Sequence, residues 1–179
     1  QKNNVIFNKN DTECLQSLQS KIYSVASLFA GIGGVDLGFM QATCNIKWAN
    51  EIDEKACQTY ANNFNHQIIC DDIKNLDLQS LKKVDILTAG FPCQAFSIAG
   101  YRKGFDDDRG CLFFDVMKIV TVLKPKVLFL ENVKNLQSHN QGKTLKKITK
   151  IIINAGYFLK YAVLNTCEYS YIPQNRERI

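Results

Sequence analysis

The residue best suited to covalent chemistry is Cys93, in the stretch Gly90-Phe91-Pro92-Cys93-Gln94. An apolar run at 84–89 precedes this stretch and predicts a buried strand. Proline fits the end of a strand and the start of a loop, because its ring fixes φ and it has no N–H to donate. A thiol on such a loop is placed to attack a bound molecule. A lone cysteine is more often a small buried side chain, so the rest of the chain must supply a cofactor site, an acid and a substrate.

A glycine-rich turn could hold the cofactor. The stretch Phe29-Ala30-Gly31-Ile32-Gly33-Gly34 separates an apolar run from a helical pattern, and glycines there let a ligand approach the backbone at a helix N-terminus. Glu51 ends the next expected strand, about 20 residues on, where an acid can hold a ribose hydroxyl pair. The pattern G-x-G-G lacks the full G-x-G-x-x-G fingerprint, which favours a mononucleoside-like cofactor over NAD. A tight turn without a ligand is the alternative.

Two further acids follow expected strands. Asp72 comes after the strand at 67–70 and could accept a hydrogen bond from an adenine amino group; a helix N-cap or a solvated turn is an equal alternative. Glu131 follows the apolar run at 126–130 and could be a partly buried acid, with a helix-capping carboxylate as the alternative.

Basic residues form two patterns. Arg176 and Arg178 alternate, so in an extended segment both point to one face, and a charged surface strand is the plainer interpretation. Four lysines share one face of the helix expected at 144–154, which favours a solvated surface over a nucleic-acid contact. They are Lys143, Lys146, Lys147 and Lys150.

Alternating strands and helices must position these residues. The expected strands cover 24–30, 45–51, 67–70, 84–89, 126–130 and 157–165, and the expected helices cover 35–41, 54–64 with Asp53 as N-cap, 111–123 and 144–154. This order predicts an α/β fold with a mostly parallel sheet and helices on both faces. Ligands bind outside the carboxyl ends of such strands. That rule collects Gly31, Glu51, Asp72, Cys93 and Glu131 on one edge, within a domain at 24–179 after a lead-in segment at 1–23.

The composition is consistent with one globular domain and argues against several other classes of protein. The chain has 179 residues, 46% hydrophobic and 22% charged, as in ordinary globular proteins. No apolar run is long enough to span a bilayer, and the polar start does not resemble a secretory signal. Seven cysteines, an odd number without C-x-x-C spacing, argue against a disulfide framework or a metal site and favour the cytoplasm. The net charge of +5 permits a polyanionic partner.

Five blocks, in order and in register, match a known family: the sequence resembles the DNA (cytosine-5)-methyltransferases, in particular those of bacterial restriction–modification systems. The resemblance runs from about residue 24 to residue 179. Any one block is a weak signal, and five in register are a strong one. The blocks are SLFAGIGG (27–34), GFPCQAFS (90–97), DRG with LFF (108–110 and 112–114), ENV (131–133) and QNRER (174–178).

The resemblance implies a Rossmann-like fold that binds S-adenosylmethionine and transfers its methyl group to carbon 5 of cytosine. The cofactor would lie over the glycine turn, with Glu51 on its ribose, Asp72 beside its adenine and Pro92 near its methionine end. The implied cofactor-binding residues are Phe29, Ala30, Gly31, Ile32, Gly33, Gly34, Glu51, Ile52, Asp72, Ile73 and Pro92.

For the reaction, the resemblance implies that Cys93 adds to carbon 6 of the cytosine, so that carbon 5 can take the methyl group. Glu131 would hold the ring nitrogen and exocyclic amine, and Arg178, with Arg176, would contact the ring oxygen. Since the base lies inside double-stranded DNA, it must be flipped out. A loop at 95–109, with Gln94, Ser97 and Arg109 as substrate or loop residues, would close behind it.

The sequence departs from the family after residue 179, where a target-recognition domain and a final segment of the cofactor pocket are expected. We therefore expect a second chain or a further C-terminal part to complete the site, and exposed apolar surface where it docks. Two other interpretations stay open at this point. One is a non-catalytic cofactor-binding or assembly subunit, and the other is the related tRNA cytosine-5 methyltransferase.

Overall fold

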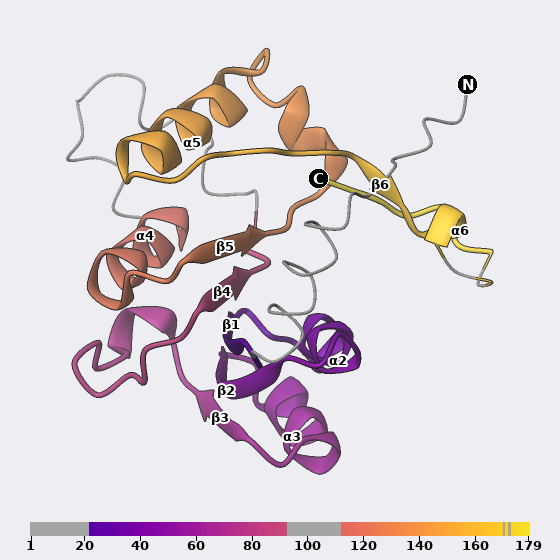
Figure 1. Cartoon of the computed structure of the whole chain (residues 1–179). Coiled ribbons are helices and arrows are strands. Elements are labelled where there is room, and N and C mark those ends of the chain that lie inside the picture. Colours follow the sequence, from indigo (N-terminus) through magenta and orange to yellow (C-terminus); the bar gives the residue numbers. More distant parts are fainter. Residues whose placement is uncertain (1–21, 93–111, 170, 172) are drawn as a thin grey trace, which may run out of the picture.

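A computed structural model describes residues 22–92, 112–169, 171 and 173–179 of the chain. Five strands form one sheet in the order β3-β2-β1-β4-β5, and every neighbouring pair is parallel (Figure 1). The strands are β1 (Ser24–Leu28), β2 (Asn45–Glu51), β3 (Gln67–Cys70), β4 (Ile86–Ala89) and β5 (Val127–Leu130). The α/β class expected from the sequence is confirmed.

Helices cover both faces of this sheet. Helices α2 (Gly34–Gln41) and α3 (Glu54–Asn63) lie on one face, and α4 (Leu112–Leu123) and α5 (Lys143–Asn154) lie on the other (Figure 1). Asp53 accepts a hydrogen bond from the Ala56 N–H at 2.8 Å and so caps α3, as its sequence position predicts. Two short 3-10 helices, Ile73–Asn75 and Lys134–Gln137, follow β3 and β5. No helix in the described part of the chain is long and apolar enough to cross a membrane.

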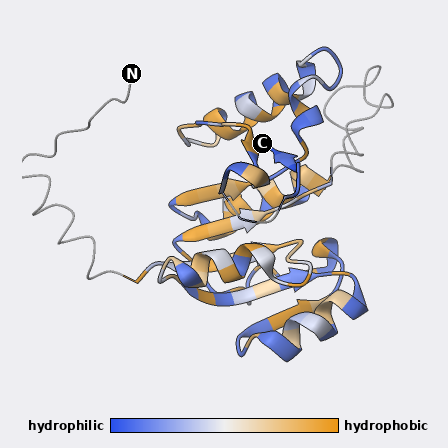
Figure 2. Ribbon diagram, turned by 90° about the vertical axis from the view of Figure 1, so that its right-hand side faces the viewer, coloured by the Kyte–Doolittle hydropathy of each residue, from blue (hydrophilic) through white to orange (hydrophobic). Residues whose placement is uncertain are grey.

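The core forms because the strands carry apolar residues at most of their buried positions and the helices are apolar on one side. Figure 2 shows hydrophobic colour along some of the strands, whereas the helices alternate between hydrophobic and hydrophilic residues. The central helix α4 buries most of its side chains, and Trp48, Tyr60 and Phe113 are fully buried. Helix α5 buries Ile148 and Ile152 and exposes the four lysines of its other face, which agrees with a solvated lysine surface.

Strand β5 lies at one edge of the sheet. In the described residues it pairs with β4 alone, and its side chains Val127 and Phe129 are 49% and 46% exposed. Phe129 still makes an edge-to-face contact with Phe39 of α2, with ring centroids 5.4 Å apart. An apolar strand with a free edge invites pairing with another strand.

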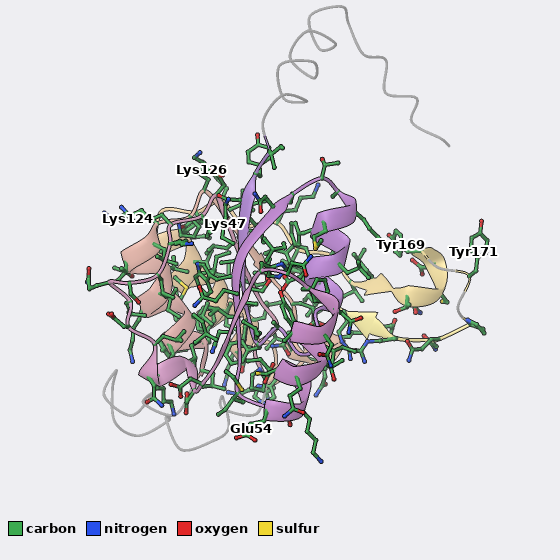
Figure 3. All side chains as sticks on the ribbon, turned by 90° about the horizontal axis from the view of Figure 1, so that it is seen from below. Lys47, Glu54, Lys124, Lys126, Tyr169 and Tyr171 are labelled. Atoms are coloured by element: carbon green, nitrogen blue, oxygen red, sulfur yellow. The ribbon has the colours of Figure 1, made fainter. Side chains whose placement is uncertain are left out.

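The strand expected at 157–165 is wrong in extent. Residues 157–163 have no regular secondary structure, and only β6 (Leu164–Asn165) is a strand. It pairs antiparallel with β7 (Glu177–Arg178) in a separate two-stranded sheet. Residues 157–161 line a groove beside β5, and 157–163 have no ladder partner in the described chain. The short helix α6 (Thr166–Tyr169) follows β6, and exposed Tyr169 and Tyr171 lie at the outer end of this hairpin (Figure 3).

Candidate active site

The carboxyl ends of the five parallel strands lie level with one another. Leu28 at the end of β1 is in register with Asn50 and with Ala89, and Ala89 is in register with Leu130. The segments that follow these residues therefore meet at one edge of the sheet. They carry the glycine turn, Glu51, Asp72, Gly90 and Glu131, as the sequence pattern predicts.

The Glu51 carboxylate accepts hydrogen bonds from the backbone of two segments, the glycine turn and the residues that follow β2. Its Oε2 accepts a hydrogen bond from the Gly31 N–H at 2.8 Å, and its Oε1 accepts from the Ile52 and Asp53 N–H groups at 2.8 and 3.0 Å. Three of the roughly four acceptor positions of the carboxylate are thus used within the protein. Glu51 fixes the glycine turn against the end of β2 and keeps about one acceptor position for a ligand hydroxyl.

The glycine turn has a shape that leaves its backbone open. Phe29, Gly31 and Gly33 have positive φ values of 57°, 55° and 94°. A Cβ added at Gly31 would meet no atom within 4 Å, whereas one at Gly33 would lie 2.2 Å from the Phe64 ring. The turn therefore packs on one side and is open on the other. An open, glycine-lined backbone of this kind fits a ligand that approaches the N-terminus of α2.

The other residues expected around the cofactor lie in two environments. Ile52 is 61% exposed next to Glu51, and Ile32 in the glycine turn is 63% exposed, so both offer apolar surface to a ligand. Asp72 accepts a hydrogen bond from the Lys74 N–H at 3.0 Å and caps the first 3-10 helix, which agrees with the capping alternative while leaving its second oxygen available. Ile73 is buried and supports this turn from below.

Glu131 and Arg178 form an ion pair at the other end of this edge. Arg178 Nε lies 2.8 Å from Glu131 Oε1, and both side chains are partly exposed. A Cβ added at Gly90 would lie 3.2 Å from Glu131 Oε2, so Glu131 also faces the loop that leads to Cys93. The geometry thus brings together a carboxylate, a guanidinium and the start of the cysteine loop, although 47 residues separate the first two in sequence.

Asn132 is a structural residue of the site that the sequence reasoning did not single out. Its Nδ2 donates to the Phe91 carbonyl at 2.7 Å, and its backbone exchanges both hydrogen bonds with Ile179 at 2.8 and 2.9 Å. The side chain is buried. Asn132 therefore ties the segment before Cys93, the end of β5 and the end of β7 to one another. A buried amide at a strand end is the signal that could have found it.

The remaining expected site residues have two outcomes. Arg176 is held by its backbone, whose N–H donates to Asn165 Oδ1 at 3.1 Å, and its side chain is exposed instead of meeting Glu131 as Arg178 does. Pro92 is exposed at the end of the described segment. Cys93, Gln94, Ser97 and Arg109 lie outside the described residues.

Cys57, which contacts Glu51, is unsuited to nucleophilic attack. The Cys57 thiol is buried and donates to the Glu51 carbonyl at 3.5 Å. Burial, together with Cys70, Glu51 and Asp53 nearby, raises the pKa of Cys57 to about 12. It therefore stays a thiol at neutral pH, and the thiolate is the form that attacks.

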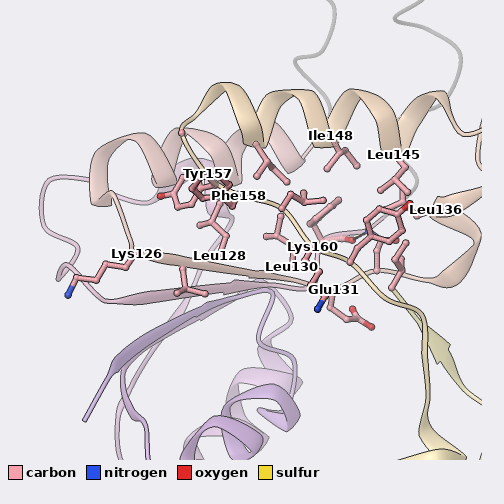
Figure 4. A pocket seen from close by; sticks show the side chains of 18 residues that line it. Lys126, Leu128, Leu130, Glu131, Leu136, Leu145, Ile148, Tyr157, Phe158 and Lys160 are labelled. Atoms are coloured by element: carbon pink, nitrogen blue, oxygen red, sulfur yellow. Dashed lines mark hydrogen bonds between the residues drawn. The ribbon is translucent and has the colours of Figure 1, made fainter. Parts of the chain in front are cut away.

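An apolar groove of about 350 Å³ lies beside β5 and is distinct from the glycine turn. Its walls are β5, α5 and the segment 156–161 (Figure 4), and Ile179 also lines it. Leu128, Leu130, Leu145 and Ile148 face into it, while Glu131 and Lys160 lie at its open end. None of the cofactor residues expected from the sequence lines this groove, whereas the expected catalytic residue Glu131 does.

The model of the family described as C-5 cytosine-specific DNA methylase matches residues 23–179, nearly the whole described part of the chain. The chain belongs to this family. Among curated relatives, this C-5 cytosine methylase chain is 50% identical over 157 residues to the Type II methyltransferase M.Bsp6I of Bacillus sp. (strain RFL6), covering 87% of this chain and 50% of that protein. It is 45% identical over 152 residues to M.HhaI of Haemophilus parahaemolyticus, covering 85% and 46%.

The fold agrees with solved methyltransferases. The crystal structure of the S. pombe Dnmt2 methyltransferase superposes with a TM-score of 0.67 at 22% identity, over 88% of this chain and 48% of that one. The methylase chain thus has a methyltransferase fold and spans about half the length of the curated relatives it matches.

Proposed function

We propose that this chain forms the catalytic part of an enzyme that methylates carbon 5 of cytosine in double-stranded DNA. The observation that carries the proposal is the Glu131–Arg178 ion pair, at 2.8 Å, beside the loop that leads to Cys93. An acid and a guanidinium next to a nucleophilic thiol match what cytosine activation needs. The family membership supports the same reaction.

S-adenosylmethionine is the proposed methyl donor, because it supplies a methyl group on a sulfonium that carbon can attack. The open backbone of Gly31 and Gly34 and the exposed Ile32 and Ile52 would hold its nucleoside. Glu51 would use its remaining acceptor position for a ribose hydroxyl. Asp72 would use its second oxygen for the adenine, with Phe29, Ala30, Gly33 and Ile73 shaping the pocket and Pro92 near the methionine end.

The residues of this chain would activate the base. The Cys93 thiolate adds to carbon 6, and the electron pair of the broken double bond makes carbon 5 nucleophilic. Glu131 holds ring nitrogen 3 and the exocyclic amine, and Arg178 holds the ring oxygen and orients Glu131. After methylation, carbon 5 loses its proton and the carbon–sulfur bond breaks, which restores the double bond and the thiolate.

The proposed substrate is a cytosine flipped out of duplex DNA, since neither face of carbon 6 is accessible inside the stacked helix. Gln94, Ser97 and Arg109 would belong to the loop behind the flipped base. An enzyme of this kind acts in the cytoplasm of a bacterium, as one half of a restriction–modification system. Arg176, exposed beside Arg178, would contact the DNA or the base.

We propose further that a segment or chain carrying a target-recognition domain completes the enzyme and docks at the edge of β5. Val133 bridges Arg178 in antiparallel fashion, and Asn132 pairs with Ile179. A strand that continues in this direction would run along β5, cover Val127 and Phe129 and fill the apolar groove. Such strand addition satisfies the edge hydrogen bonds and buries the exposed apolar side chains.

A fusion tests the proposed function. Residues 23–179 are joined to the part of M.Bsp6I that this chain does not match, and the fusion, called the completed enzyme below, is expressed in bacteria that lack cytosine methylation. We expect 5-methylcytosine in plasmid DNA, measured by bisulfite sequencing, and none with either part alone. A folded fusion that binds S-adenosylhomocysteine but leaves the DNA unmethylated would instead indicate a non-catalytic cofactor-binding chain.

A further inference from the structure

Four buried polar side chains and one half-buried histidine form a cluster around the two ends of the glycine turn. Ser27 precedes the turn in β1 and Asp36 follows it in α2; both are 1% exposed. Tyr60 of α3, Thr88 of β4 and His66, just before β3, complete the set. We call these five residues the Asp36 cluster. It connects β1, β4 and the start of β3 to helices α2 and α3.

The hydrogen bonds of the Asp36 cluster all lead to Asp36. The hydroxyls of Ser27 and Tyr60 donate to its two carboxylate oxygens. Since each hydroxyl has one proton, Ser27 must accept from Thr88, 2.8 Å away, and Tyr60 must accept from His66 Nε2. Asp36 is therefore an acceptor at both oxygens, and no described buried side-chain nitrogen or oxygen lacks a partner.

This arrangement stabilises a buried carboxylate at the start of a helix. Burial raises the pKa of Asp36, and the hydrogen bonds from Ser27 and Tyr60 oppose that rise. Asp36 lies in the first turn of α2, where the helix dipole favours negative charge. Removing one donor would leave a desolvated oxygen unpaired, which a buried acid tolerates poorly.

The Asp36 cluster also supports the strained backbone of the turn. Phe29 has φ 57°, an unfavourable value for a bulky residue, and such conformations persist only where the surroundings hold them. Gly33 packs directly on the Tyr60 and Phe64 rings, which would lie 3.0 and 2.2 Å from an added Cβ. Tyr60 thus contacts the turn through its ring and Asp36 through its hydroxyl.

We infer that Asp36, Ser27 and Tyr60 are positioning residues for the proposed cofactor, because their hydrogen bonds hold the glycine turn in its open, ligand-ready conformation. This inference rests on the proposed function. A turn that spends only a fraction of its time in the competent conformation lowers the apparent affinity by that fraction. The cluster touches no expected substrate position, so its loss changes cofactor binding and leaves DNA binding unchanged.

The test compares the loss of two side-chain hydroxyls in the completed enzyme. Tyr60→Phe removes a donor from Asp36, whereas the control Thr121→Val removes the 2.9 Å hydrogen bond to the Met117 carbonyl within α4, away from the glycine turn. Calorimetry measures the Kd of S-adenosylhomocysteine, and kinetics measure KM separately for cofactor and DNA. We expect Tyr60→Phe to raise the Kd and the cofactor KM about tenfold, equal to about 1.4 kcal/mol, with the DNA KM unchanged. Thr121→Val should leave all three unchanged.

The outcomes separate this inference from the proposed function. If Tyr60→Phe lowers the melting temperature as Thr121→Val does but binds S-adenosylhomocysteine normally, the positioning role is overturned and the proposed function stands. If the unsubstituted enzyme binds no S-adenosylhomocysteine, both fail. Should Tyr60→Phe not fold, Ser27→Ala removes the other donor to Asp36 and is measured in its place. A normal Kd for a folded Ser27→Ala variant would overturn the inference equally.

Discussion

Arg178 Nε lies 2.8 Å from Glu131 Oε1, and this pair joins the end of β5 to β7 at the carboxyl edge of the parallel sheet. Neither residue reaches this position through its own element alone. Glu131 extends beyond β5, and β7 places Arg178 there because Val133 and Asn132 pair with Arg178 and Ile179. The pair faces Gly90 and so lies beside the loop that carries the proposed nucleophile.

Glu131→Gln should remove the charge that Arg178 orients and reduce methylation by the completed enzyme by about 100-fold or more, the usual contribution of a positioned acid. The cost in stability should be small, because both side chains are partly exposed and such pairs contribute about 1 kcal/mol or less. Single-turnover kinetics and thermal unfolding measure the two effects separately.

Lys134→Ala is the control for that substitution. It breaks the neighbouring exposed pair between Lys134 and Glu177 at 2.7 Å, on the same two segments, without touching Glu131. We expect methylation within about twofold of the unsubstituted enzyme, since the pair is exposed. Equal losses in the two variants would mean that the Glu131–Arg178 pair holds the segments together and has no part in activating the base.

Glu51→Gln should weaken the binding of S-adenosylhomocysteine by about tenfold, because hydrogen bonds to a charged acceptor contribute about 1.5–3 kcal/mol. The substitution also replaces one of the acceptors for the Gly31, Ile52 and Asp53 N–H groups by an amide. Glu54→Gln, in the exposed first turn of α3, is the control and should bind normally. Calorimetry on the completed enzyme measures the Kd of S-adenosylhomocysteine for both variants. An unchanged Kd in Glu51→Gln would mean that Glu51 does not bind the cofactor.

Substitution by alanine should lower the free energy of unfolding much more at Gly33 than at the neighbouring Gly34. Gly33→Ala forces a Cβ to within 2.2 Å of the Phe64 ring at a φ of 94°, so it should cost about 2 kcal/mol or more in the free energy of unfolding. Gly34→Ala enters open space at the start of α2 and should change stability by about 0.5 kcal/mol or less. Urea unfolding of both variants tests this, and equal costs would contradict the packing of the turn on α3.

His66 should make the protein less stable in mild acid. Burial lowers the pKa of His66, and the negative charge of Asp36 only partly opposes this. The unfolded chain therefore binds a proton at higher pH than the folded one, so stability is full above the unfolded value of about 6.5 and falls as the pH drops towards the folded pKa. Unfolding midpoints at pH 7.5 and 5.5 should differ more in the unsubstituted chain than in His66→Gln, and an equal or reversed difference would refute the assignment.

Much of the sheet follows from local sequence. The predicted bounds of the second and third strands, 45–51 and 67–70, are those observed, because each is a short stretch around buried or partly buried apolar residues with polar turn signals nearby. The common edge for Gly31, Glu51, Asp72 and Glu131 follows from the general rule for parallel sheets. The capping of α3 by Asp53 could also be predicted from the sequence, since it depends on two residues only three positions apart.

What depends on long-range pairing could not be predicted in this way. An apolar run at 157–165 satisfies the strand pattern, yet only Leu164 and Asn165 find a partner strand. The Asp36 cluster was missed because Asp36 looks like an exposed acid in the first turn of a helix, and only the fold brings Tyr60 and Ser27 to it. The separate environments of Arg176 and Arg178 likewise arise from the β6–β7 pairing.

Covalent trapping tests the central claim most directly. Duplex DNA with 5-fluorocytosine at the target position is incubated with the completed enzyme and S-adenosylmethionine, and since carbon 5 then has no proton to lose, the adduct at carbon 6 cannot resolve. Denaturing electrophoresis and peptide mass spectrometry should find a stable complex through Cys93, absent in Cys93→Ser and retained in the control Cys167→Ser, whose cysteine is exposed. A complex that forms equally well with Cys93→Ser would contradict the account.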